Sequence, residues 1–194
     1  MTRGPELHGE LVRLRPIIAT DADRMWESVQ DPEALRLTGT TADFTREQIG
    51  EWARTVSDRP GRYDWAITSA AVRDGHQVSD EMIGEIVLNE IDEHARSANI
   101  RLILLPNYRG RGYGRDAIFA VLQWAFTQGA DGLDLHRVSL DVLSINPRAQ
   151  MLYESLGFQV EGRLRDVYLD GDLYSDAIVM AILEDEFRGL AAQG

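Results

Sequence analysis

The chain of 194 residues contains no cysteine, and this absence already excludes several classes of protein. Without thiols it can form no disulfide framework, no cysteine nucleophile and no zinc–thiolate site, so we expect no bound metal. It also lacks an uninterrupted apolar run of about 18 residues, which a membrane-spanning helix requires. The first residues lack the apolar core of a signal peptide. These absences predict a soluble cytoplasmic protein without a membrane partner.

Positive charge is scarce, because 20 lysine and arginine residues stand against 32 aspartate and glutamate residues, for a net charge of −12. An acidic surface repels the phosphate backbone of nucleic acids and attracts cationic partners. Nucleic-acid binding is therefore not expected, whereas a basic partner is compatible with this surface. The simpler interpretation, that the acidic surface only keeps the protein soluble, stays open.

The spacing of apolar residues predicts both strands and helices. Strands are expected over residues 11–15, 63–72, 82–91, 98–105, 137–143, 159–169 and 173–183. Helices are expected over residues 21–30, from 45 onward, and over 116–128 and 147–156, with Thr20 and Thr45 as N-caps and Gly129 and Gly157 as terminators. The Asp170-Gly171-Asp172 turn predicts a closing hairpin. This order favours an α+β (mixed α/β) class, a mixed sheet flanked by about four helices.

A glycine-rich turn follows the strand that ends before Pro106 and precedes a predicted helix. Glycines let the backbone approach a ligand closely, and the helix start directs unpaired N–H groups and positive dipole charge into the same space. Such a turn predicts an anion site for a phosphate or pyrophosphate. Arginines add positive charge along the stretch, which consists of Arg109, Gly110, Arg111, Gly112, Tyr113, Gly114 and Arg115.

Two common nucleotide-binding motifs also contain glycine-rich turns of this kind. The nucleotide P-loop is excluded because no Gly-Lys-Ser/Thr follows the glycines. Gly112–Ala117 matches the G-x-G-x-x-A dinucleotide pattern, which leaves a nicotinamide enzyme as a competing interpretation. Too little sequence follows, however, to form the second half of a dinucleotide-binding fold.

The stretch Arg109–Gly114 resembles the R/Q-x-x-G-x-G/A signature of the GNAT superfamily of N-acetyltransferases. Asn146–Phe158 is similar to a second element of that family, N-x-x-A-x-x-L-Y-x-x-x-G-F, and the resemblance extends over residues 82–183. Glu161–Arg165, together with Asp176, and Leu135–Val138 resemble the RimJ/RimL-type branch, which acetylates ribosomal-protein N-termini.

The resemblance implies the GNAT fold, a central, mostly antiparallel mixed sheet with a splayed parallel pair, in one domain over residues 1–194. The acceptor-side part would cover about residues 1–80, the acetyl-CoA-binding core about 82–160 and the C-terminal hairpin about 159–183. Family members are monomers or dimers, and the sequence does not choose between a monomer and a homodimer.

The resemblance also implies which residues bind acetyl-CoA. Backbone amides from Arg109 to Gly114, with the helix start at Arg115, would hold the pyrophosphate of coenzyme A. The main chain of the splayed strand at Ile103, Leu104 and Leu105 would pair with the pantetheine arm. Asn146 would contact the cofactor, and it can equally serve as the N-cap of the helix that begins at Pro147.

Acetyl transfer requires an amine to attack the thioester of acetyl-CoA, so a base must remove a proton from the amine and an acid aids the departing thiolate. The resemblance assigns Tyr153 as the acid, the more so because Ala149 stands where the RimJ/RimL branch commonly has serine. Asp141 matches the position of a catalytic glutamate in some family members. Competing bases on other strands and loops are Glu85, Glu90, His94 and His136.

The sequence therefore predicts an acyltransferase that acetylates a primary amine through a ternary complex. The acceptor is either a protein N-terminus or a small-molecule amine. The alternative is a non-catalytic acyl-CoA-binding sensor or partner subunit. Aromatic residues of the N-terminal part are expected either to line the acceptor pocket or to pack in the core, namely Trp26, Phe44, Trp52, Tyr63 and Trp65.

Overall fold

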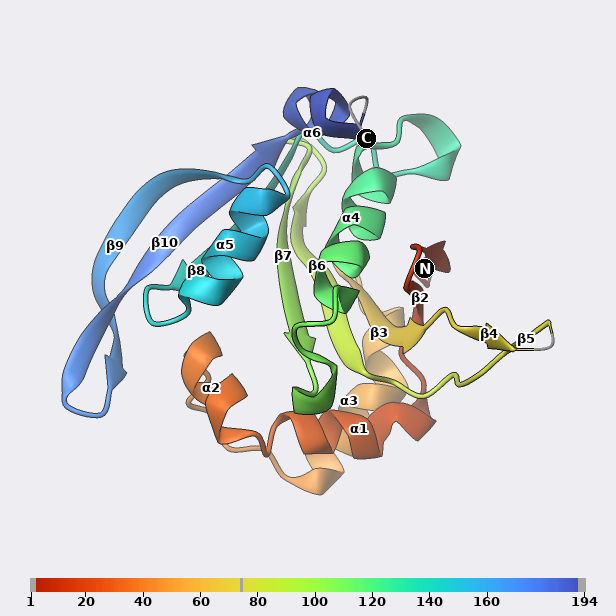
Figure 1. Cartoon of the computed structure of the whole chain (residues 1–194), viewed down its shortest axis with the longest axis horizontal. Coiled ribbons are helices and arrows are strands. Elements are labelled where there is room, and N and C mark those ends of the chain that lie inside the picture. Colours follow the sequence, from red (N-terminus) through yellow and green to blue (C-terminus); the bar gives the residue numbers. More distant parts are fainter. Residues whose placement is uncertain (1–2, 74, 192–194) are drawn as a thin grey trace.

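The computed structural model describes residues 3–73 and 75–191, and an open eight-stranded sheet dominates it (Figure 1). The strand order is β1-β2-β3-β6-β7-β8-β10-β9. Their bounds are β1 Leu7–His8, β2 Val12–Pro16, β3 Tyr63–Ser69, β6 Gly84–Asp92, β7 Ser97–Leu104, β8 Arg137–Leu143, β9 Gln159–Asp170 and β10 Leu173–Leu183. A separate two-stranded ribbon pairs β4 (Val72–Arg73) with β5 (His76–Gln77). The predicted mixed sheet and closing hairpin are confirmed.

Six α-helices accompany the sheet in the described residues, rather than about four. They are α1 Ala22–Ser28, α2 Pro32–Thr38, α3 Arg46–Thr55, α4 Tyr113–Phe126, α5 Pro147–Ser155 and α6 Glu184–Ala191. The sequence prediction missed α2 and α6, which are short and carry few apolar residues at helical spacing. Helix α2 nevertheless has clear boundaries, because the side chain of Asp31 accepts a hydrogen bond from the Glu33 amide and Gly39 ends it in the left-handed conformation.

Two helix starts and one helix end test the predicted caps. Thr45 caps α3 as predicted, since its hydroxyl accepts from the Gln48 amide and the Gln48 side chain accepts from the Thr45 amide. Thr20 is not the cap of α1, because it lies inside a 3-10 turn and Asp21 takes the cap position. Gly129 does not end α4, which stops at Phe126 before an extended residue.

The parallel pair β7–β8 forms the opening in the sheet. The two strands pair with each other only from Ser97–Arg137 to Asn99–Ser139 and then separate, while β7 stays paired with β6 and β8 with β10. All other neighbouring strands are antiparallel. The splayed parallel pair expected from the resemblance is thus present, and it leaves unpaired main chain at the carboxyl end of β7.

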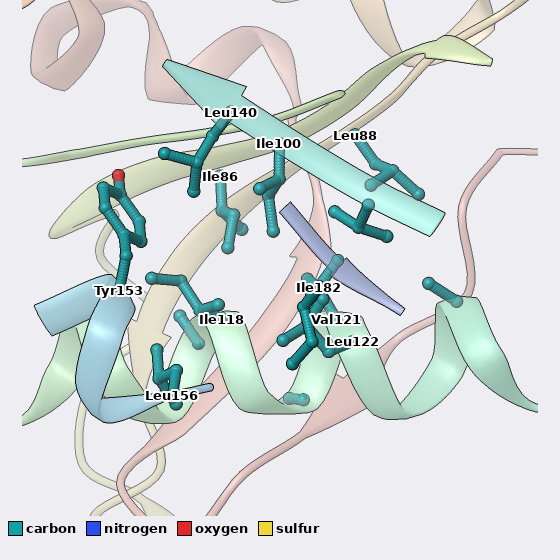
Figure 2. Close-up of a cluster of buried hydrophobic side chains, with 14 of the residues drawn as sticks. Ile86, Leu88, Ile100, Ile118, Val121, Leu122, Leu140, Tyr153, Leu156 and Ile182 are labelled. Carbon is teal, nitrogen blue, oxygen red and sulfur yellow. The ribbon is translucent and has the colours of Figure 1, made fainter. Parts of the chain in front are cut away.

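The main core lies between the sheet and helices α4 and α5 (Figure 2). Alternate strand residues point toward these helices, and each fully buried Leu, Ile or Val side chain contributes about 1.5–3 kcal/mol of transfer free energy. The side chains in the figure that fill this layer are Ile86, Leu88, Ile100, Leu140, Ile118, Val121, Leu122, Leu156 and Ile182. A smaller core on the other face joins α1 and α3 to β3 through Met25, Ile49, Ala53 and Ala66. No helix in the described part of the chain is long and apolar enough to cross a membrane.

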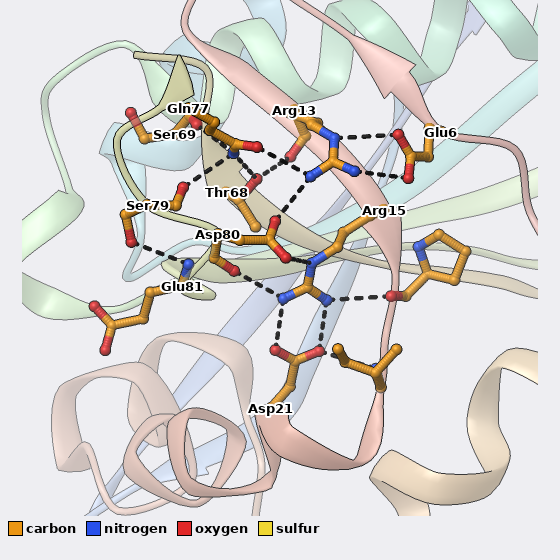
Figure 3. A network of polar contacts seen from close by, with 12 residues as sticks. Glu6, Arg13, Arg15, Asp21, Thr68, Ser69, Gln77, Ser79, Asp80 and Glu81 are labelled. Carbon is orange, nitrogen blue, oxygen red and sulfur yellow. Dashed lines mark hydrogen bonds and ion pairs between the residues drawn. The ribbon is translucent and has the colours of Figure 1, made fainter. Parts of the chain in front are cut away.

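A buried ion-pair network fixes the start of α1 against β2 (Figure 3). Both terminal nitrogens of Arg15 donate to the carboxylate of Asp21 at 2.8 Å, and Arg15 also bonds the side chain and carbonyl of Asp80. Asp21 additionally accepts from the amide of Ile18. Arg15 and Asp21 are only 6% and 4% exposed. Removing Arg15 would leave the buried Asp21 charge without its cationic partner, and removing Asp21 would leave the buried Arg15 charge to the more exposed carboxylate of Asp80. The pairing with Arg15 therefore explains why Asp21, rather than Thr20, occupies the N-cap position of α1.

Candidate functional site

The glycine turn has the backbone geometry of an anion cradle. Gly110 and Gly112 have φ values of +73° and +88°, a left-handed region that other residues rarely adopt. Helix α4 begins directly after Gly112, so its first N–H groups have no partners within the helix. Gly114 allows α4 to approach β7, because a Cβ there would lie 3.0 Å from a methyl group of Leu102. The turn therefore has the backbone geometry of an anion site.

The arginines of the motif do not all face this cradle. Arg109 turns toward α2, where it pairs with Asp31 and Glu33 and donates to the Leu104 carbonyl at 2.9 Å. Arg115 donates to the Ser155 carbonyl and hydroxyl at the end of α5. The exposed side chain of Arg111 stays at the turn. The motif therefore carries positive charge toward the cradle through fewer side chains than the sequence suggests.

Arg148 supplies a charge that the sequence analysis missed. Its guanidinium lies against Gly110, so closely that a Cβ at Gly110 would overlap it. Arg148 is the second residue of α5. Only the packing of α5 beside α4 brings it to the glycine turn, since 38 positions separate it from Gly110 in the chain.

The main chain of β7 is divided between two neighbours. In an antiparallel pair, alternate residues direct their N–H and C=O groups to the partner strand. The amide of Leu105 donates to the Ile83 carbonyl, and the same alternation places the main chain of Ile103 against Glu85. Leu104, and Leu102 two residues earlier, therefore face the splay. Of the three residues expected to pair with the pantetheine arm, only Leu104 turns its main chain away from β6, and its carbonyl already accepts from Arg109. Leu102 turns its main chain to the same side.

A cavity of about 380 Å³ passes through the sheet at the splay. Residues from both faces line it. Leu102, Asn146 and Tyr153 come from the face that α4 and α5 cover, whereas Glu85 and Asp141 come from the opposite face. The predicted acid, both leading predicted bases and the predicted cofactor contact Asn146 thus share one cavity.

Glu85 is the carboxylate that the structure perturbs most clearly. It is half-buried on β6, and burial, assisted by the nearby charge of Asp64, raises its pKa to about 7, while Arg62 acts in the opposite direction. A carboxylate with this pKa is divided between its two protonation states at neutral pH, which suits a general base. The buried Asp64 is itself held by a bidentate pair with Arg62 at 2.7 Å.

Asp141 of β8 and Tyr153 of α5 line the part of the cavity that lies across the splay from Glu85 of β6. Asp141 is exposed and points to the opposite face of β8 from its buried neighbours Leu140 and Val142. Tyr153 is 9% exposed and stacks edge-on against Phe158 at 5.7 Å. Burial, with a smaller effect of the Asp141 charge, raises the pKa of Tyr153 to about 12, so its hydroxyl keeps its proton at neutral pH.

The remaining candidates lie elsewhere. Glu90 and His94 are exposed and do not line the cavity, and His136 pairs with Glu184 at 3.2 Å at the far end of β8. Among the N-terminal aromatic residues, none lines this cavity. Tyr63 and Trp65 stack with Trp124 of α4, while Trp26 and Trp52 pack in the smaller core. Core packing is therefore the better interpretation for those four residues.

Asn146 has the dual placement that its position suggested. Its side-chain oxygen accepts from the Ala149 amide at 3.2 Å, which caps α5, and the residue also lines the cavity. Pro147 occupies the first position of the helix, where its missing N–H costs no hydrogen bond.

Helix α2 forms an outer wall that the sequence analysis did not anticipate. Leu37 and Thr38, the last residues of α2, line the cavity together with Thr40, which follows the helix. Arg36 binds Asp170 of the hairpin, and Arg109 holds the helix start, so α2 is fastened at both ends. The signal available in the sequence was Asp31-Pro32 followed by Gly39, a cap, a first-turn proline and a terminator.

Comparisons with known proteins agree with this geometry. The model of the acetyltransferase (GNAT) domain family matches residues 12–159. The spermidine N(1)-acetyltransferase of Vibrio cholerae is 36% identical over 106 residues, which make up 55% of this chain and 59% of that protein. The sequence match therefore spans little more than half the length of that relative. The uncharacterized N-acetyltransferase p20 of Bacillus licheniformis is 27% identical over 94% of this chain and 98% of its own length.

A solved structure extends the likeness to nearly the whole fold. The crystal structure of spermidine N-acetyltransferase from Vibrio cholerae in complex with CoA and spermine has a TM-score of 0.77 and 25% sequence identity to this chain. The superposition covers 91% of this chain and 98% of that one.

Proposed function

This chain belongs to the GNAT acetyltransferase family, and we propose that it transfers the acetyl group of acetyl-CoA directly to a primary amine. The observation that carries the proposal is the cavity through the sheet, which joins the cofactor face to Glu85 and Asp141 on the opposite face. The acetyltransferase names of its relatives do not favour the alternative of a non-catalytic acyl-CoA-binding protein.

The cofactor half of the site would use the glycine turn and the splay. The amides that begin α4, with Arg111 and Arg148 beside them, would hold the pyrophosphate, and the main chain of Leu102 and Leu104 would bind the pantetheine arm. Acetyl-CoA supplies a thioester-activated acetyl group. An amine acceptor would approach from the opposite face, so the two substrates need not displace one another.

Glu85 is the proposed base. A primary ammonium has a pKa of about 10.4, so a carboxylate at its ordinary value of about 4.3 would take its proton with a penalty of about 8 kcal/mol. The pKa of about 7 that burial gives Glu85 reduces this penalty to about 4–5 kcal/mol. The amine nitrogen then forms the new bond to the acyl carbon as the carbon–sulfur bond breaks, and the proton that the new amide nitrogen loses passes to the departed thiolate.

Tyr153 is the proposed partner of the departing sulfur. An alkyl thiol has a pKa of about 8.5. Full proton transfer from a phenol with a pKa of about 12 would therefore be unfavourable by about 5 kcal/mol. We infer that the Tyr153 hydroxyl donates a hydrogen bond to the sulfur while the charge develops, and that the thiolate leaves without taking the tyrosine proton.

The relatives support a small-molecule amine as acceptor, because three of the related proteins are named spermidine N(1)-acetyltransferases. The ribosomal-protein N-terminus suggested by residues 161–165 is a second acceptor to test. The experiment follows acetyl-CoA consumption and product mass by mass spectrometry against a panel of amines and N-terminal peptides. Acetylated product is expected, and failure with every amine while coenzyme A binds would favour a binding protein.

A tyrosine variant tests the assignment within the same assay. Tyr153→Phe is expected to lower kcat by about 10- to 100-fold, because one hydrogen bond to a developing charge is lost. Tyr174→Phe, which removes a hydroxyl from the exposed hairpin, should match the unaltered protein. Turnover that Tyr153→Phe leaves unchanged would remove Tyr153 from the mechanism.

A further inference from the structure

We infer that Arg101 is an anchor for an anionic group of the acceptor, so that the preferred substrate is an amine that also carries a carboxylate or a phosphate. The inference rests on the proposed function and narrows its substrate class. It follows from the position of one guanidinium on the acceptor face of the cavity.

Strand register places Arg101 between the two candidate bases. Arg101 lies opposite Val87 on β6, and Ile103 lies opposite Glu85, so the side chains of Arg101 and Glu85 share one face. On the other side, Asn99 pairs with Ser139 of β8, which puts Asp141 on the same face two residues further along. Arg101, Glu85 and Asp141 all line the cavity.

Arg101 is available for a ligand. Its side chain is exposed, and within residues 3–73 and 75–191 it forms neither an ion pair nor a side-chain hydrogen bond. Arg109, which also borders this region, is by contrast committed to Asp31, Glu33 and the Leu104 carbonyl. The five donors of the Arg101 guanidinium are therefore available to a ligand in the cavity.

The cofactor does not account for this charge. The glycine turn contacts the face of the sheet that carries Leu102 and Leu104, since Gly114 packs against both side chains. Alternation along β7 directs Arg101 to the opposite face. The pyrophosphate charge is therefore expected on the far side of the sheet, next to Arg111 and Arg148.

Charge complementarity favours an acceptor with both signs of charge. The charged residues that line the cavity are Glu85, Asp141 and Arg101. An acceptor amine beside Glu85 that carries an anion toward Arg101 pairs both groups, and guanidinium binds carboxylate or phosphate through a two-bond fork. A polyamine bound in the same way would place a second ammonium against Arg101, which is repulsive.

The test compares acceptors that differ only in the anion. The pairs are leucine with leucinamide and phosphoethanolamine with ethanolamine, which separate carboxylate from phosphate, and spermidine is the polycation. For each pair, kcat/KM is measured with the unaltered protein, Arg101→Gln and Arg101→Lys. Dividing the preference of each variant by that of the unaltered protein removes intrinsic differences in amine reactivity. Calorimetry with the coenzyme A complex measures acceptor binding without turnover.

We expect Arg101→Gln to reduce the preference for the anionic member of one pair by about 10- to 100-fold, chiefly through KM, because a charge-assisted hydrogen bond is lost. Arg101→Lys should retain part of the preference, since it keeps the charge without the fork. The control Arg54→Gln removes an exposed arginine of α3 that pairs with Glu51 on the same helix, and it should leave the preference unchanged.

The two proposals fail in different ways. An unaltered preference in Arg101→Gln, or spermidine as the best acceptor of the unaltered protein, would overturn the role of Arg101 while leaving the acetyltransferase intact. Absence of turnover with every amine would count against the proposed function. In that case, calorimetric binding of leucine or phosphoethanolamine that depends on Arg101 would still support the anion site, and absence of such binding would overturn it.

Discussion

The two faces of the sheet hold the residues of the proposed site in place by different interactions, apolar packing on one face and ion pairs on the other. On the cofactor face, the turn and helix α4 come from the continuous stretch 109–126, and they rest on a layer of buried aliphatic side chains. On the acceptor face, Glu85, Arg101, Asp141 and the end of α2 come from separate segments, and ion pairs hold the surrounding elements.

This difference indicates which half of the site tolerates change. Apolar packing is non-directional and is spread over many contacts, so one substitution in that layer removes only part of it. A buried ion pair depends on both partners, and the loss of one leaves an uncompensated charge. The acceptor face should therefore be the more sensitive to single charge changes, and the cofactor face the more sensitive to changes of backbone conformation.

The largest effect is expected from Glu85→Gln, which removes the proposed base. We expect kcat/KM to fall by about 100- to 10,000-fold, while Asp141→Asn, its matched control across the cavity, costs less than about tenfold. In the unaltered protein the rate should rise with pH through about 7, because Glu85 must lose its proton to act. A larger loss in Asp141→Asn than in Glu85→Gln would exchange the two roles.

The same variant has an opposite effect on stability. The folded-state pKa of Glu85 is raised above its ordinary value of about 4.3, so protonated Glu85 favours folding, and this stability is lost as the pH rises from about 4.3 through about 7. Glu85→Gln should therefore raise Tm by about 2–6 °C at pH 8 and leave it nearly unchanged at pH 5. Calorimetric unfolding at both pH values checks this.

The next largest effect concerns the ion pairs of the acceptor face. Asp21→Asn leaves the buried Arg15 with its contacts to Asp80 and to the Pro16 carbonyl, and we expect a loss of about 3 kcal/mol, or a fall in Tm of about 6–12 °C. Asp58→Asn, which breaks an exposed pair with Arg3, should leave Tm nearly unchanged. The Kd for coenzyme A at low temperature should not change in either variant, and a change with Asp21→Asn would show that the two faces are coupled.

A backbone change addresses the cofactor face. Gly112→Ala forces a side chain into a left-handed conformation at the start of α4 and should weaken coenzyme A binding about tenfold. Gly171→Ala meets the same conformational penalty at φ +65° in the hairpin turn, where no atom lies within 4 Å of the added Cβ. Both variants are expected to lower Tm by similar amounts in thermal unfolding. Only Gly112→Ala should raise the Kd for coenzyme A, which titration calorimetry measures. Equal Kd values would separate the turn from the cofactor.

The smallest effect is expected from Arg109→Gln, which tests whether the first arginine of the glycine-rich motif acts on the acceptor or on the cofactor. Because Arg109 holds α2 over the acceptor side, Arg109→Gln should raise the acceptor KM about 3- to 10-fold and change the Kd for coenzyme A less than threefold. Arg46→Gln, a surface pair on α3, serves as control. If the Kd for coenzyme A rose instead and the acceptor KM stayed constant, Arg109 would act on the cofactor, as the motif alone suggests.

Local patterns accounted for most elements but not for their edges. The capping box at Thr45, the Asn146-Pro147 helix start and the Asp170-Gly171-Asp172 turn each involve residues within a few positions, and all three appear where predicted. Thr20 failed as a cap because the nearby carboxylate of Asp21 is required by Arg15, a partner on another element. Helix α2 was missed because tertiary ion pairs, rather than an apolar stripe, hold it.

The sequence by itself determined the mixed sheet, its closing hairpin and the glycine turn, since turn and cap chemistry acts over a few residues. Only the tertiary structure decided what surrounds that turn. The side chain of Arg109 points away from the turn and pairs with residues at the start of α2, whereas Arg148 of α5 lies against Gly110 of the turn. The alternation of β7 between two neighbours selects Leu102 and Leu104 over Ile103 and Leu105. The same alternation places Arg101 beside Glu85, because the facing of a strand residue depends on register with strands that are distant in the chain.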